Sequence, residues 1–174
     1  MLSLQSRTSK NSEVTSQLAA AADRIATIGR MHRRLHSCDG ERTVAFRQLL
    51  DDLCRDFSAM VSPGPERAIT VEGIELRVPS ATAIPLGFIV NELITNAVKH
   101  GKGRITVRLE ANPEKGYALS VSNDGPGLPK RFDVAARKGL GMMIVRSFVE
   151  RIGGALQVGR AADNEGTRFT VLFA

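Results

Sequence analysis

The chain has 174 residues, of which 43% are hydrophobic and 24% are charged, and its formal net charge is +6 at pH 7. These values are typical of a soluble globular domain and exclude a disordered or fibrous protein. The Lys and Arg residues are interspersed with acidic ones, which argues against a nucleic-acid partner and suits an anionic small ligand or an acidic protein.

The longest apolar stretch, residues 84–90, contains Pro85 and Gly87 and is far shorter than the ~20 residues that a membrane helix requires. The N-terminal segment MLSLQSRTSK lacks the features of a secretory signal. We therefore expect a cytoplasmic protein without direct membrane insertion. Cys38 and Cys54 are too few for a disulfide framework or a zinc cluster, and we expect both to be reduced thiols.

Two antiparallel helices, the first of them cut short, are predicted at the N-terminus. The segment before Ser12 is typical of the end of one helix followed by a tight polar connection. From Ser12 to Leu35 apolar residues recur every three or four positions, which predicts a long amphipathic helix. Turn residues then place a boundary between a partial helical hairpin, 1–40, and a second domain, 41–174.

The second domain begins with a predicted helix, a hairpin and another helix. An amphipathic pattern predicts the first helix over 43–60, before a segment rich in proline and glycine. Residues 68–79 hold two β-rich runs separated by an acidic residue and a glycine, which predicts the hairpin. Ser80 is the expected N-cap of a helix that continues to His100.

Strands dominate the rest of the chain. They are predicted over 103–112, 116–123, 155–160 and 167–173, with a glycine-bearing loop over 125–138 and a helix over 140–152 between them. Helices and strands in one layer each predict an α+β fold, a two-layer α/β sandwich whose mixed, mostly antiparallel sheet carries helices on one face.

One face of the helix predicted at 80–100 carries Glu92, Asn96 and Lys99, which lie four and three residues apart. A carboxylate and an amide oxygen suit a magnesium ion that bridges phosphate oxygens, and a lysine neutralises phosphate charge. The same side chains are equally typical of an ordinary solvated helix face, so this motif alone leaves both interpretations open.

The segment SVSNDGPGLP places Asp124 at the end of a strand, just before Gly125 and Gly127. A carboxylate there can accept a hydrogen bond from the amino group of adenine, and glycines let the backbone approach a flat ring. Taken alone, the Asp-Gly pair is more typical of a plain turn.

Two further glycine-bearing segments follow. In KGLGMMIVRSFVERIGG a helix begins at Gly139 and Gly141, and its free amide groups suit phosphate oxygens, although a simple loop end explains these glycines equally well. The spacing is neither the Walker pattern nor the dinucleotide fingerprint. NEGTRFTVLF places Gly166 and Thr167 at the start of the last strand, where a hydroxyl can support a base site.

In order and approximate spacing, these segments resemble the ATP-binding domain of histidine kinases, in the gyrase, Hsp90 and MutL superfamily (GHKL, with the Bergerat fold). NELITNAVKHG resembles its asparagine box, NDGPG and GLGM its glycine boxes, and GTRF its closing motif. The N-terminal hairpin resembles that of the HisKA_2 subfamily. In the sister HWE group a histidine stands early in the asparagine box and a Trp-x-Glu signature follows, whereas this chain has Asn91 before Glu92 and no tryptophan.

The resemblance implies the catalytic ATP-binding domain of a two-component sensor histidine kinase, with ATP and Mg²⁺ as cofactors and the receiver domain of a response regulator as partner. It implies that Glu92, Asn96 and Lys99 are the catalytic residues, that Asn96 and Glu92 bind the metal, and that Asp124 binds the adenine amino group. Nucleotide contacts are further implied for Asn96, Lys99, His100, Gly125, Gly127, Leu128, Lys138, Gly139, Leu140, Gly141, Met142 and Thr167.

The phosphorylated histidine of that family precedes the segment that LSLQ resembles, and His32, His36 and His100 stand in other contexts. Two explanations remain, a piece of a longer kinase and a natural short protein that acts in trans, and we favour the first. In either case we expect phosphate to be donated to a histidine outside this chain, without autophosphorylation of the chain as given. A homodimer through the hairpin is a further expectation.

Two alternatives remain open. An anti-sigma-type serine kinase uses the same ATP fold, but it needs no hairpin like residues 1–40. A non-catalytic phosphotransfer or dimerisation adaptor would have no use for the intact Asn96, Asp124 and glycine segments.

Overall fold

The computed structural model describes residues 43–60, 68–100, 102–125, 139–161 and 166–174, together with Gly29 and Gly127. The chain divides into two compact units, Met1–Gly40 and Glu41–Ala174. Most of the predicted N-terminal hairpin, including His32, His36 and Cys38, lies outside the described residues, as do Leu128 and Lys138 of the predicted glycine-bearing loop.

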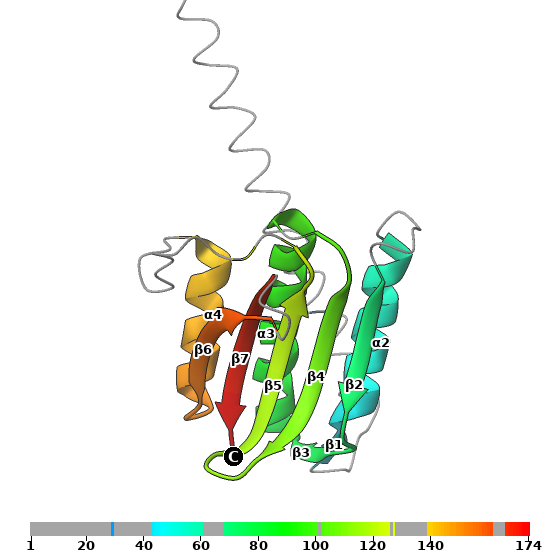
Figure 1. The fold of residues 1–174 in the computed structure, drawn as a ribbon. Helices are drawn as coiled ribbons and strands as arrows, with labels where there is room; N and C mark the ends of the chain where they lie inside the picture. The colour runs from blue at the N-terminus through cyan, green and yellow to red at the C-terminus, as the bar shows by residue number, and fades with distance from the viewer. Residues whose placement is uncertain are drawn as a thin grey trace, which may run out of the picture. The chain divides into compact units, whose positions relative to one another are not determined.

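The second unit contains a mixed five-stranded sheet (Figure 1). In order across the sheet, the strands are β2 (Ile69–Gly73), β4 (Ile105–Asn112), β5 (Gly116–Asn123), β7 (Thr167–Phe173) and β6 (Ala155–Arg160). β2 runs parallel to β4, and the other three pairs are antiparallel. The predicted α+β class with a mixed, mostly antiparallel sheet is confirmed.

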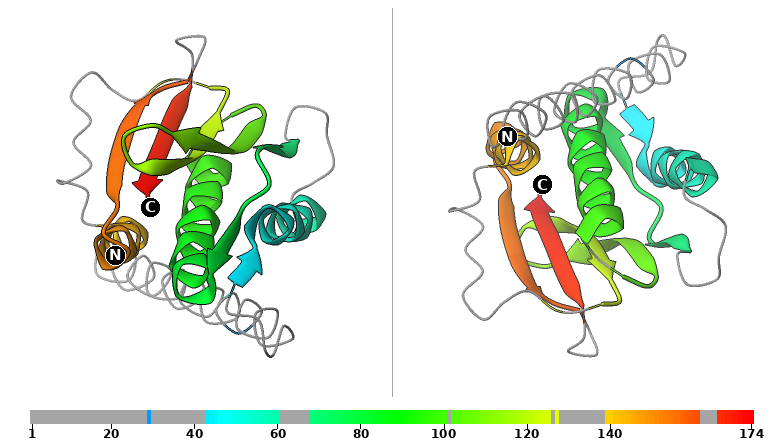
Figure 2. Two further views of the ribbon diagram at one scale, coloured as in Figure 1. Left: turned by 90° about the horizontal axis from the view of Figure 1, so that it is seen from below. Right: turned by 90° about the horizontal axis from the view of Figure 1, so that it is seen from above.

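Three helices cover one face of this sheet. They are α2 (Phe46–Met60), α3 (Ser80–His100) and α4 (Leu140–Arg151). Seen along the strands, α3 lies in the middle, with α4 and α2 on either side of it (Figure 2). The core lies between these helices and the sheet, where side chains such as Phe46, Leu50, Ile89 and Phe173 are buried.

α3 is the central core helix. Leu86, Ile89, Val90 and Ile94 have no exposed surface. Within the described part of the chain, Ser80–Lys99 is the one stretch that is long and apolar enough to span a membrane, with a mean hydropathy of 1.3. Because 56% of it is buried inside this fold, its apolar character is explained by packing against the sheet and the neighbouring helices.

The predicted hairpin over 68–79 is wrong. β2 pairs in parallel with β4, from Ile69 opposite Ile105 to Gly73 opposite Leu109. The chain leaves β2 at Gly73, whose φ is 110°, and a second, two-stranded sheet forms between β3 (Arg77–Pro79) and β1 (Thr43–Ala45). Each strand thus finds its partner far away in the sequence, so the two runs do not pair with each other.

The predicted helix over 43–60 begins too early, because Thr43–Ala45 form β1. The N–H of Phe46, the first residue of α2, donates to Leu76 O at 2.8 Å. This hydrogen bond joins the start of α2 to the segment that leads into β3.

A tight turn joins β4 to β5. Asn112 Oδ1 accepts hydrogen bonds from the backbone N–H groups of Glu114 and Lys115, at 3.1 and 2.9 Å. An asparagine that bonds to the backbone ahead of it is a common way to close such a turn.

Candidate functional site

The four glycine- and asparagine-bearing segments meet at one edge of the second unit. α3 and β5 end at this edge, whereas α4 and β7 begin there (Figure 1). The antiparallel pairing of β5 and β7 brings two of the ends together, with Asn123 opposite Thr167. Segments far apart in the sequence are therefore neighbours, as a binding site requires.

Along the last turns of α3 the predicted side chains pass from the core to the surface. Glu92 is 4% exposed, Asn96 is part-buried and Lys99 is exposed. Thr95 bonds back to its own helix, with Oγ1 donating to Asn91 O at 2.8 Å. Along the helix, the Glu92 carboxylate is thus buried, the Asn96 amide is half-buried and the Lys99 ammonium is exposed.

Asn96 also contacts the start of α4. Its Nδ2 donates to the Sδ atom of Met142 at 3.6 Å, and Met142 is 8% exposed. Gly139, the N-cap of α4, has extended backbone geometry, and no side chain among the described residues caps this helix start. Uncapped backbone N–H groups at a helix start suit an anion.

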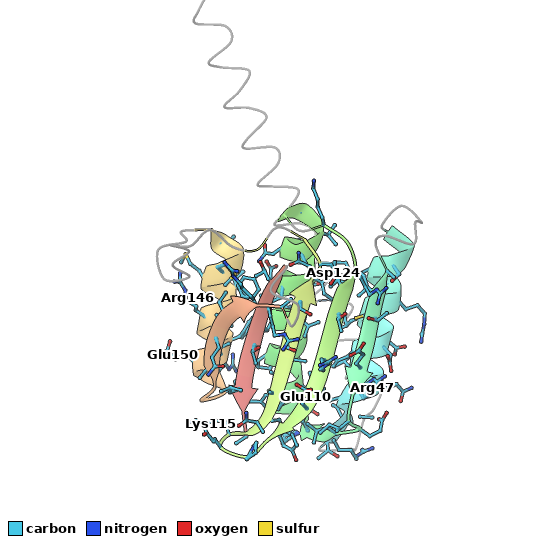
Figure 3. The ribbon with its side chains drawn as sticks, viewed as in Figure 1. Arg47, Glu110, Lys115, Asp124, Arg146 and Glu150 are labelled. Carbon is cyan, nitrogen blue, oxygen red and sulfur yellow. The ribbon has the colours of Figure 1, made fainter. Side chains whose placement is uncertain are left out.

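The other group of residues surrounds the end of β5. Asp124 is exposed, and its N–H donates to Arg104 O at 3.0 Å. Figure 3 shows Asp124 near the edge where α3 ends. Thr167 is 6% exposed and stands beside this strand end on β7, because it pairs with Asn123.

Two glycines with positive φ let the chain segments approach Asp124 closely. Gly103 has φ 73°, and a Cβ there would lie 2.8 Å from the Cβ of Asp124. Gly166 has φ 89°, and a Cβ there would overlap Asn123 O. Gly127 lies next to Gly166, since a Cβ at Gly127 would be 3.3 Å from Gly166 O.

The predicted site residues thus form two groups at the same edge. Asn96 lies with Met142, and Thr167 lies with the Asp124 segment, while Gly139 and Leu140 are exposed at the start of α4. The side chain of His100 lies outside the described residues. The roles predicted for these residues stay predictions.

Sequence reasoning missed Gly103 and the contact between Asn96 and Met142. A glycine at the start of a predicted strand, just after a predicted helix end, was the available signal for Gly103, and β4 in fact begins two residues later, at Ile105. The contact joins residues 46 positions apart, and no local pattern indicates it.

Two family models match this chain. Residues 81–174 match the family described as histidine kinase-, DNA gyrase B-, and HSP90-like ATPase. Residues 1–61 match HisKA_2, described as histidine kinase. The second match includes α2 as well as the N-terminal unit.

Known sensor kinases are similar over much of the chain. Sensor histidine kinase PdtaS of Mycobacterium tuberculosis is 28% identical over 174 residues, covering 96% of this chain and 34% of the relative. Blue-light-activated histidine kinase 2 of Erythrobacter litoralis is 31% identical over 97 residues, which are 53% of this chain and 28% of the relative. The chain thus spans about a third of the length of these relatives.

Solved structures agree with these matches. The histidine kinase domain of the Erythrobacter litoralis EL346 blue-light-activated kinase has a TM-score of 0.72 and 23% identity, over 88% of this chain and 80% of that one. The mycobacterial sensor histidine kinase MprB has a TM-score of 0.61 and 27% identity, over 75% and 95% of the respective chains. The resemblance inferred from the motifs is confirmed. The chain therefore contains the ATP-binding domain of a sensor histidine kinase, and it belongs to the histidine kinase-, DNA gyrase B-, and HSP90-like ATPase family.

Proposed function

We propose that this domain binds magnesium-ATP across the edge described above and donates the γ-phosphoryl group to a histidine outside this chain, for relay to the receiver domain of a response regulator. The main support is the meeting of two chemistries at one edge. The oxygen-bearing side chains of α3 and the carboxylate of Asp124 stand at this edge on different elements. The α3 side chains suit phosphates and a cation, and the Asp124 carboxylate suits the adenine base.

The residues of α3 fit a magnesium ion. Asn96 has an amide oxygen on a part-buried side chain, and Glu92 has a carboxylate one helical turn earlier. Among the described residues no cluster of three or more His, Cys, Asp or Glu could hold a metal. Mg²⁺ needs no such cluster, since it usually takes one or two protein ligands and completes its shell with phosphate oxygens and water. The ion would neutralise charge on the phosphates.

The carboxylate of Asp124 is proposed to accept a hydrogen bond from the exocyclic amino group of adenine. An ionised carboxylate is an acceptor only, and so it pairs with an amino group and not with a carbonyl. Thr167 is close enough to line the same region, because its strand partner is Asn123. Gly127, Gly139 and Gly141 are proposed to belong to a lid that closes over the phosphates, together with Leu128 and Lys138.

Phosphoryl transfer depends mainly on positioning and on neutralising charge. We propose that Lys99, which is exposed at the end of α3, adds positive charge beside the phosphates, with His100 next to it. The histidine kinase match at residues 1–61 favours a histidine acceptor over the serine-kinase and adaptor alternatives. A homodimer through residues 1–40 and a cytoplasmic location belong to the same proposal.

Nucleotide titrations test the proposal. Asn96→Ala should abolish the dependence of ATP affinity on Mg²⁺ while the circular dichroism spectrum stays unchanged. Asp124→Asn should weaken ATP binding about tenfold, because the adenine amino group would then donate to a neutral amide oxygen in place of a charged carboxylate.

Asp52→Asn is the matched control for Asp124→Asn. Asp52 lies midway along α2 in an ion pair with Arg55 and belongs to none of the four predicted site segments, so its replacement should leave ATP affinity unchanged. Lack of any magnesium-ATP affinity in the unaltered chain would end the proposal. Equal effects of the two Asp→Asn changes would remove Asp124 from it.

A further inference from the structure

The hydrogen bond between Asn96 and Met142 joins the two helices that border the proposed phosphate region. The Asn96 amide is part-buried, and its Nδ2 lies 3.6 Å from the Sδ atom of Met142. Further along the same helix pair, Phe88 of α3 stacks on Phe148 of α4, with ring centroids 5.2 Å apart. The first contact joins the first turn of α4 to the last turns of α3, and the second joins the same two helices farther from the edge.

The contact distinguishes the two ends of the amide. An asparagine amide has a donor end, the NH₂ group, and an acceptor end, the carbonyl oxygen. A thioether sulfur accepts hydrogen bonds and donates none. Met142 therefore favours the orientation in which Nδ2 faces α4, because a rotated amide would set oxygen lone pairs against sulfur lone pairs.

A magnesium ion requires the other end of the same amide, the carbonyl oxygen. It takes oxygen ligands and cannot use an amide nitrogen. With Nδ2 held toward α4, Oδ1 is directed away from the sulfur of Met142. The orientation that the sulfur favours is thus the one in which the metal ligand is available.

We propose that Met142 is a positioning residue for the magnesium site, which acts through Asn96 by holding the amide with its oxygen toward the ion. The inference rests on the proposed function of Asn96 as a metal ligand. An apolar side chain of similar size cannot take this role, since only the sulfur of Met142 can accept the hydrogen bond.

The chain supplies a matched pair of variants. Met142→Leu removes the sulfur and keeps a side chain of similar volume, so the core is expected to tolerate it. Met143→Leu makes the same chemical change at the next residue, which is 53% exposed, where its side chain extends into solvent. A difference between the two variants therefore reports on residue 142, through its sulfur or through its packing, and a double-mutant cycle separates these two causes.

Two measurements should separate the variants. In the metal-free protein, the side-chain NH₂ resonances of Asn96 should shift in Met142→Leu and stay in place in Met143→Leu. In titrations with ATP, Met142→Leu should weaken affinity about threefold to tenfold when Mg²⁺ is present, as expected for the loss of one modest hydrogen bond. Affinity without Mg²⁺ should fall by a clearly smaller factor, which reflects only the predicted nucleotide contact of Met142.

A double-mutant cycle tests whether the effect passes through the amide. The carboxylate created by Asn96→Asp has no N–H group to donate, and either of its oxygens can bind the ion. In that background Met142→Leu should not alter the magnesium dependence. An equal effect of Met142→Leu in both backgrounds would assign Met142 to packing and overturn the inference.

The remaining outcomes are also decisive. Unchanged Asn96 resonances and unchanged magnesium dependence in Met142→Leu would overturn the inference while leaving the proposed function intact. Weaker ATP binding to the same extent with and without Mg²⁺ would do so as well. If Asn96→Ala keeps the full magnesium dependence, the metal assignment itself fails, and the inference fails with it.

Discussion

Gly166 controls how closely β5 and β7 approach at the proposed base site. Its φ is 89°, and a side chain there would collide with Asn123 O. Gly166→Ala should therefore lower the free energy of unfolding by about 2–3 kcal/mol, because backbone strain adds to a steric clash with the main chain. Urea denaturation measures this loss.

Gly153 supplies the control for that substitution. Its φ is 64°, but a Cβ there meets nothing within 4 Å. Gly153→Ala should cost about 1 kcal/mol, which is the cost of the left-handed conformation alone. Equal losses in the two variants would mean that the strand ends move apart easily and that Gly166 does not hold them together.

A second prediction at the residue scale concerns pH. Burial, with a smaller contribution from Asp51, raises the pKa of the Cys54 thiol to about 12. The thiol of the unfolded chain ionises near pH ~8.5, so above about pH 9 the unfolded state loses a proton that the folded state keeps. The free energy of unfolding should fall as the pH rises through this range, by up to about 1.4 kcal/mol per pH unit.

Comparison with Cys54→Ala isolates this contribution. The variant should be less stable at pH 8, yet its stability should fall less steeply between pH 8 and pH 10. Other groups titrate equally in both proteins, so they cancel in the difference. Parallel curves would show that the thiol ionises as readily in the folded protein as in the unfolded one.

At the scale of elements, α2 protects an edge of the sheet. Among the strands that the structure describes, β2 has a neighbour, β4, on one side only. On its other side Arg47 donates to Val71 O at 3.0 Å and to Gly73 O at 2.8 Å, and its guanidinium also pairs with Asp51 at 3.4 Å. Exposed edge strands leave backbone groups unpaired, and here a guanidinium from a neighbouring helix satisfies two of them (Figure 3).

Arg47→Ala should destabilise the protein by about 1–3 kcal/mol and speed hydrogen exchange in β2, because hydrogen bonds from a charged donor are lost. Arg47→Lys should recover only part of this, since one ammonium does not reproduce the planar fork of the guanidinium. Arg55→Ala is the control on the same helix. Its ion pair with Asp52 is exposed, so the expected loss is below about 0.5 kcal/mol.

Element prediction from the sequence succeeded after Ser80. The bounds predicted for α3, β5, β6 and β7 agree with those observed, because glycine, proline and polar turns separate long, clearly periodic segments there. Before Ser80, the helix over 43–60 was predicted with its first three residues wrong, and the two β-rich runs were predicted with the wrong pairing. β1 was missed and β2 was mispaired, because their partners, β3 and β4, come more than thirty residues later. Strand pairing depends on such partners, and a local pattern does not identify them.

Local patterns also limited what could be predicted of the candidate site. Each motif was visible because it carries unusual residues in a short stretch, such as the glycines around Asp124. Thr167 stands opposite Asn123 because β7 pairs antiparallel with β5. A single motif contains no information about that pairing. Local patterns therefore identify candidate residues one segment at a time, whereas they do not identify which residues become neighbours.

For the whole molecule, the ATPase family match and the folding unit have different boundaries. The match covers residues 81–174, whereas the compact unit begins at Glu41 and includes α2 and β2. Phe46, Leu49, Leu50 and Leu53 of α2 are at most 5% exposed. At about 2 kcal/mol for each buried side chain, α2 contributes about 8 kcal/mol, which is comparable to the whole stability of a small domain.

Residues 41–174 expressed alone should therefore unfold in one cooperative transition and bind ATP within a few-fold of the full chain. Residues 81–174 expressed alone should show no cooperative transition, because β4 loses its parallel partner and the core loses α2. Circular dichroism melting curves and ATP titrations distinguish the two. A cooperative transition in the shorter piece would contradict the role given to α2.

The turn that Asn112 closes between β4 and β5 lies at the far end of the strand from Asp124, as the labels of Lys115 and Asp124 show (Figure 3). The eight residues of β5 place roughly 24 Å between the two ends of the strand. A dye or a surface tether attached at residue 115 would thus leave the opposite edge open to solvent. Immobilised in this way, the domain would become an optical or gravimetric sensor for nucleotides.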